Sequence, residues 1–119
     1  MRLSRISLAD ARIALGAGLF RMAGREAYIA ALNAARAIIF ERMTVAPKQH
    51  STTKRYVHEL VHKQQLDIDR DTLDILREGF DVKVSADYGP YMEVPELKAE
   101  ALVQRAELFV ERIGKALEG

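Results

Sequence analysis

Apolar residues fall on almost every side of residues 26–43 when this stretch is drawn as a helix, a pattern typical of a helix buried inside a domain. Two polar side chains, Asn33 and Arg36, lie about one turn apart within it. A buried polar group left unpaired costs about 1–3 kcal/mol, so both side chains need partners. The pattern therefore predicts a central helix over residues 25–43 that carries either an internal polar network or a ligand contact.

The residues before this stretch predict another helix, over residues 7–22. Ser7, followed three residues later by an acid, has the form of a helix start. Gly16 and Gly18 each weaken a helix by about 1 kcal/mol, and we expect close approach of a neighbouring helix to compensate for them. Gly24 is expected to separate the two helices.

Three further helices are predicted downstream, over residues 51–65, 70–87 and 95–117. Pro47 disfavours a helix just before the first of them, and Asp67 and Asp69 form a turn with capping side chains before the second. Residues 81–85 also alternate with the period of a strand, but this run is too short and too isolated to pair with another strand. The helical interpretation is therefore preferred there.

Five helices joined by short loops predict an all-α fold, an antiparallel up-and-down bundle of four to five helices. The chain has 119 residues, so we expect a single helical domain over residues 1–119. Apolar residues make up 49% of the chain and charged residues 29%, a balance that argues against wholesale disorder.

Charge and cysteine content narrow the classes of function. The net charge of +1 gives no support for a strongly basic nucleic-acid arm, and the absence of cysteine excludes disulfides and thiolate chemistry. His58 and His62 have a zinc-ligand spacing without a third ligand nearby, so neither a metal site nor a cofactor is expected. No apolar run approaches the roughly 20 residues that span a bilayer, so we expect a cytoplasmic protein with no membrane contact.

Four short motifs, in this order, resemble those of the HEPN domains, and they cover the chain from about residue 8 to residue 117. The resemblance is closest to a small prokaryotic branch of that family. The motifs are AYIAALNAARAII over residues 27–39, the turn Pro47-Lys48-Gln49-His50-Ser51, Lys83 with Ala86-Asp87-Tyr88, and Ala106-Glu107-Leu108-Phe109-Val110.

The resemblance implies a helical bundle that commonly forms a dimer. Many HEPN domains are encoded beside a small nucleotidyltransferase and form toxin–antitoxin pairs with it. In the active members, an Arg followed after four to six residues by a His makes a metal-independent RNase site across the dimer. A histidine there moves the proton of a ribose 2′-hydroxyl, and the arginine stabilises the charged phosphorane.

This chain departs from that pattern. Lys83 stands in place of the Arg, and Asp87 with Tyr88 stands in place of the His. Lysine lacks the planar fork of arginine, and an ionised aspartate repels phosphate. The sequence therefore favours a HEPN-type module, one half of a nucleotidyltransferase-paired toxin–antitoxin or stress-response system. It is expected to form a homodimer, to bind its nucleotidyltransferase partner, and to contact a nucleotide or RNA phosphate through Asn33, Arg36, Lys83, Asp87 and Tyr88.

The alternative is a divergent metal-independent RNase, in which His50 supplies acid–base chemistry and Lys83 holds phosphate. His50 would then lie against the end of the helix that carries Lys83 and Asp87. The structural interpretation of the same residues pairs Asp87 with Arg36 or with Lys83 and places Tyr88 in the core, hydrogen-bonded. The sequence leaves open whether the protein is an enzyme.

Two further patterns give weaker indications of function. Arg55 and His62 have the RNase spacing, but they lie on an outer helix away from the family position, which favours coincidence. Residues 51–78 resemble two helices around a turn, as in a DNA-binding regulator, but the turn is acidic and unfavourable beside DNA phosphate.

Overall fold

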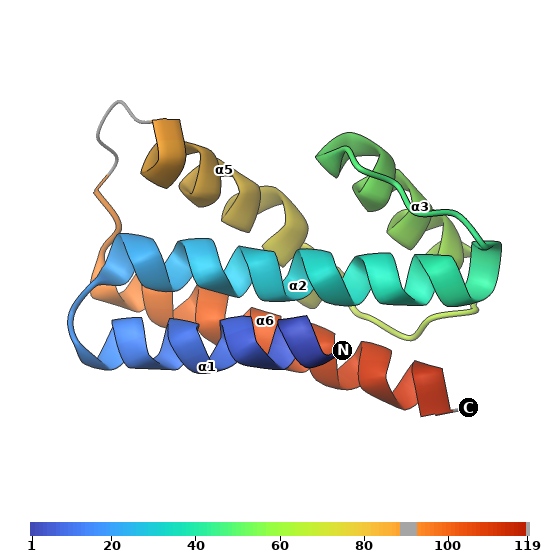
Figure 1. The fold of residues 1–119 in the computed structure, drawn as a ribbon, viewed down its shortest axis with the longest axis horizontal. Coiled ribbons are helices and arrows are strands. Elements are labelled where there is room, and N and C mark those ends of the chain that lie inside the picture. The colour runs from blue at the N-terminus through green and yellow to red at the C-terminus, as the bar shows by residue number, and fades with distance from the viewer. Residues whose placement is uncertain (89–92, 119) are drawn as a thin grey trace.

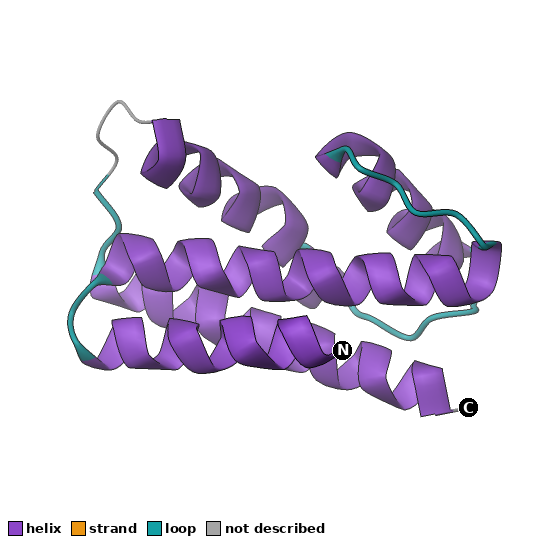
Figure 2. Cartoon of the chain, viewed as in Figure 1, coloured by secondary structure: helices purple, strands orange, loops and turns teal. Residues whose placement is uncertain are grey.

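The computed structural model describes residues 1–88 and 93–118, and within them every regular element is a helix (Figures 1 and 2). The all-α prediction is therefore confirmed, and the strand alternative for residues 81–85 is excluded. No helix of the described residues combines the length and apolar character needed to cross a bilayer. The helices are α1 (Arg2–Gly16), α2 (Phe20–Met43), α3 (His50–His62), α4 (Arg70–Leu73), α5 (Ile75–Tyr88) and α6 (Glu96–Glu118).

The central position predicted for the apolar helix is confirmed in α2. This helix contacts α1, α3, α5 and α6, and its neighbours α1 and α5 run antiparallel to it (Figure 1). Much of its buried surface is alanine, which lets other helices approach closely. The buried side chains of α2 are Ala23, Ala27, Tyr28, Ala30, Ala31, Ala34, Ala35, Ile38 and Ile39.

The predicted boundaries of the first helix are wrong. The helix begins at Arg2, and Ser7 lies buried inside it, because Ser4 and Ser7 continue the inward-facing stripe. It ends at Gly16, where Gly18 adopts a φ of +76°. There the Leu19 N–H donates to the Ala14 carbonyl and the Gly18 N–H to the Leu15 carbonyl, a pattern that closes many helix ends.

The close approaches between helices occur at other glycines than those predicted. A Cβ at Gly16 or Gly18 would meet nothing within 4 Å, so no neighbouring helix compensates for them. Gly24 lies inside α2 rather than between helices, and its Cβ would stand 2.8 Å from Val82 Cγ1 of α5. A Cβ at Gly79 of α5 would stand 2.7 Å from Tyr28 Cβ of α2.

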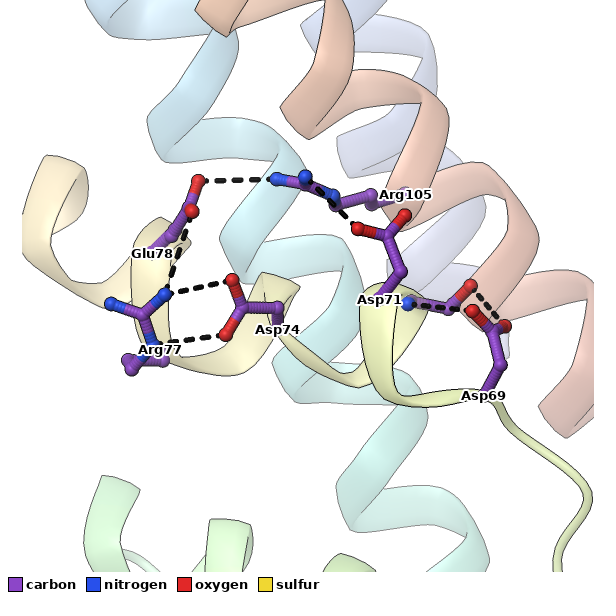
Figure 3. A network of polar contacts seen from close by, with 7 residues as sticks. Asp69, Asp71, Asp74, Arg77, Glu78 and Arg105 are labelled. Carbon is purple, nitrogen blue, oxygen red and sulfur yellow. Dashed lines mark hydrogen bonds and ion pairs between the residues drawn. The ribbon is translucent and has the colours of Figure 1, made fainter.

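The helix predicted over residues 70–87 is interrupted at Asp74, between α4 and α5. The predicted cap before it is confirmed, since the Asp69 carboxylate accepts hydrogen bonds from the Thr72 N–H and hydroxyl. Arg105 of α6 bridges both pieces through Asp71 of α4 and Glu78 of α5 (Figure 3). The interruption has no signal in the apolar pattern, although Asp at its position is a residue type that favours helix starts.

Candidate functional site

His50 is the first residue of α3, and it lies between two aromatic rings from other helices. Its Nδ1 is 2.8 Å from the hydroxyl oxygen of Tyr28 on α2. The imidazole stacks on Phe80 of α5, with ring centroids 3.9 Å apart and an interplanar angle of 17°. Tyr28 is 1% exposed and meets Phe80 edge-on, so all three rings hold one another in place.

Burial sets the protonation of this cluster. It raises the pKa of Tyr28 to about 12, a rise that Arg36 opposes, so the hydroxyl keeps its proton. Burial, and then the charge of Lys54, lower the pKa of His50, while Asp81 acts in the opposite direction. The imidazole is therefore neutral at neutral pH. The Tyr28 hydroxyl and Nδ1 of the neutral imidazole share one hydrogen bond, and the direction of that bond follows the tautomer of the ring.

Arg36 holds the loop that precedes α3. Its Nη2 donates to the Lys48 carbonyl at 2.9 Å, while its Nε is buried without a partner in the described part of the chain. Asn33 is half-buried, three residues earlier on α2. Of the two predicted partners of Asp87, Lys83 contacts it and Arg36 does not. Asp87 lies instead beside Arg25, and Arg25 is about 16 Å from Arg36 along the α2 axis.

A second cluster surrounds the carboxylate of Asp87. Arg25 Nε contacts Asp87 Oδ1 at 2.6 Å, and Lys83 Nζ contacts Oδ2 at 3.0 Å. Hydrogen bonds from Arg25 and then from Lys83 hold the pKa of Asp87 below its usual range, so this carboxylate is ionised at neutral pH. The Lys83 ammonium also lies over the Tyr88 ring, 5.5 Å from its centroid. Tyr88 is 77% exposed, so its predicted place in the core is wrong.

The residues predicted to form one site thus fall into two neighbouring clusters. Phe80 and Lys83 are about one turn apart on α5, so the Phe80–His50 contact precedes the Asp87 cluster along that helix. Within residues 1–88 and 93–118, no hydrogen bond or ion pair joins His50 to Lys83. Three residues of these clusters, Arg25, Tyr28 and Phe80, were not predicted as site residues.

The missed residues differ in how visible they are from sequence. Tyr28 belongs to a motif of the central helix, and a buried tyrosine usually finds a hydrogen-bond partner. It could therefore have been predicted as a site residue from the sequence. Arg25 contacts Asp87 across 62 residues of sequence, and nothing in the local pattern marks that pair.

Comparison with known proteins identifies the family of this chain. A search of curated proteins finds no match. The family model described as HEPN domain matches residues 1–116. Because this match spans nearly the whole chain and agrees with the all-helical fold, the protein belongs to the HEPN domain family.

Proposed function

We propose that this protein is a HEPN-type module without RNase activity at the family position. It forms a homodimer, pairs with a small nucleotidyltransferase as one half of a toxin–antitoxin or stress-response system, and contributes contacts to nucleotide or RNA phosphate. The observation that carries the proposal is that the Asp87 carboxylate forms ion pairs with two cations, Arg25 and Lys83.

This ion pair argues against catalysis for a chemical reason. A phosphate that approaches Lys83 competes with a carboxylate already 3.0 Å from the ammonium. Because the pKa of Asp87 is lowered, its carboxylate carries no proton to give to a leaving group at neutral pH. His50, the other acid–base candidate, is held by Tyr28 and Phe80 instead of by Lys83.

Exposed apolar side chains support the pairing part of the proposal. On α1, Leu3, Ile6 and Ile13 are 63%, 47% and 70% exposed. Their spacing of three and then seven residues puts them on one side of the helix. Apolar side chains gathered on one exposed face often mark a protein interface, either with a second copy or with a partner.

Co-expression with the small nucleotidyltransferase encoded beside the gene tests the pairing. We expect a stable complex in size-exclusion chromatography with light scattering, and a homodimer for the protein alone. The double variant Ile6→Glu/Ile13→Glu places two charges on the exposed apolar side of α1 and should weaken either the homodimer or the complex with the nucleotidyltransferase. Val45→Glu, which adds charge at an exposed loop valine, serves as the control. A protein that stays monomeric and leaves the nucleotidyltransferase unbound contradicts the proposal.

A further inference from the structure

The outer surface of α3 carries a hollow of about 330 Å³. His50, Lys54 and His58 follow one another at intervals of four residues, so they share a side of the helix. The neighbouring side of the helix, about a quarter turn away, is fixed by the buried residues Thr53, Val57 and Leu60. The hollow is lined by His50, Ser51, Lys54, Arg55 and His58.

The hollow is rich in positive charge and has no carboxylate in its lining. Lys54 forms no ion pair within the described residues, and the Arg55 guanidinium lies 5.3 Å from the centroid of the Tyr56 ring. The acid nearest in sequence, Glu59, is held by Lys63 at 2.7 Å. By contrast, arginines elsewhere contact carboxylates, as in the pairs Arg12–Glu107, Arg77–Asp74 and Arg105–Asp71.

Burial and then the positive charge of the hollow lower the pKa values of its two histidines, His50 and His58. After burial, Lys54 is the next largest cause that lowers the pKa of His50 and of His58, and Arg70 acts on His58 as well. Asp81, from α5, is the one acid that opposes this effect on His50. A surface that resists a further positive charge attracts an anion for the same electrostatic reason.

The hydrogen-bonding groups of the hollow also suit an anion. Tyr28 engages Nδ1 of His50, and the other ring nitrogen, Nε2, is an N–H donor in the tautomer in which Tyr28 donates to Nδ1. Lys54 and Arg55 offer only donors, and the Ser51 hydroxyl offers another. Phosphate oxygens accept such bonds, and bonds to a charged acceptor are about twice as strong as neutral ones.

We propose that this hollow on α3 binds the phosphate groups of an RNA strand or of a free nucleotide. The inference deepens the phosphate-binding part of the proposed function and places that binding on α3, where the cations are free, rather than at Lys83, where Asp87 occupies the cation. Arg36 lies near the same end of α3. Its charge opposes the rise that burial causes in the pKa of Tyr28, and its Nη2 donates to the Lys48 carbonyl.

Fluorescence anisotropy with a labelled single-stranded RNA tests the site on the purified protein alone. We expect Lys54→Gln and Arg55→Gln each to weaken binding by about fivefold, the upper end for an exposed ion pair. Each should also reduce the slope of log affinity against log salt by about 0.7. Lys115→Gln is the matched control, since it removes the same charge from an ion pair with Glu111 on α6.

Titration with ATP and with inorganic triphosphate separates the sources of phosphate. If both move the imidazole resonances of His50 and His58 in NMR spectra and displace the RNA, the hollow takes free nucleotides. If only RNA moves them, it takes the strand. Equal losses of RNA affinity in Lys54→Gln and Lys115→Gln, or a protein that binds neither RNA nor ATP nor triphosphate, overturn the inference. Neither result depends on whether the nucleotidyltransferase binds.

Discussion

Gly79→Ala probes the contact that positions the candidate site, the approach of α5 to α2. The added Cβ would lie 2.7 Å from Tyr28 Cβ and 3.3 Å from Tyr28 Cα, whereas carbon atoms prefer about 3.5–4.0 Å. Tyr28 is 1% exposed, and its ring is held by His50 and Phe80, so it has little freedom to move aside. The two helices must therefore separate.

The size of the effect follows from two opposing terms. Alanine gains about 1 kcal/mol over glycine in helix propensity, while overpacking a core costs about 1–3 kcal/mol. Because the methyl group meets the Cβ of the buried Tyr28 and its backbone Cα, which cannot move aside by a rotamer change, we place the overpacking cost near the top of that range and expect a net loss of about 1–2 kcal/mol.

Urea denaturation followed by circular dichroism measures this loss. Gly16→Ala is the matched control, since its methyl group meets nothing within 4 Å, and we expect it to stabilise the protein by up to about 1 kcal/mol. The two variants should thus shift the free energy of unfolding in opposite directions. A Gly79→Ala protein at least as stable as the unaltered one would refute the close packing of α2 on α5.

Three further outcomes are expected. Tyr28→Phe removes the hydroxyl that bonds His50 and should cost about 1 kcal/mol in urea denaturation; unchanged stability together with unchanged imidazole nitrogen shifts contradicts the bond. Because the pKa values of His50 and His58 are lowered from 6.5 in the folded state, the unfolded chain binds protons first on acidification. The stability that these neutral rings contribute is present above pH 6.5 and lost as the pH falls through the lowered values, so urea midpoints should fall there, and replacing both by Gln should flatten the decline. An equally steep decline in the double variant contradicts this assignment. Asp87→Asn removes the charge that holds Arg25 and Lys83 and should lower the urea midpoint while leaving RNA binding on α3 unchanged; an unchanged midpoint argues against the ion-pair account.

The fold was predictable where the pattern of apolar residues is continuous. The central helix was predictable because its apolar positions surround the helix axis. The burial of Ile38 and Ile39 agrees with its predicted position in the middle of the domain. The start of α1 was missed because Ser4 and Ser7 are polar by residue type, yet both lie buried. Small hydroxyl side chains fit between close helices, and a count of apolar residues does not register them.

The sequence predicted some residues of the two clusters, but it predicted neither Arg25, Tyr28 and Phe80 nor the grouping of the residues. The motifs singled out His50, Lys83 and Asp87, and the structure places all three on helices near α2. Which of them touch depends on how α2 and α5 cross, and that crossing is set by the close approaches at Gly24 and Gly79. The sequence shows these glycines without showing what they face.

The proposal that the protein lacks RNase activity is tested most directly by incubating the purified protein with RNA and following cleavage by gel electrophoresis. Because Asp87 engages Lys83 and His50 bonds Tyr28, we expect the RNA to stay intact. Cleavage by the unaltered protein that disappears in both His50→Ala and Lys83→Ala would contradict the account and identify the chain as a divergent RNase.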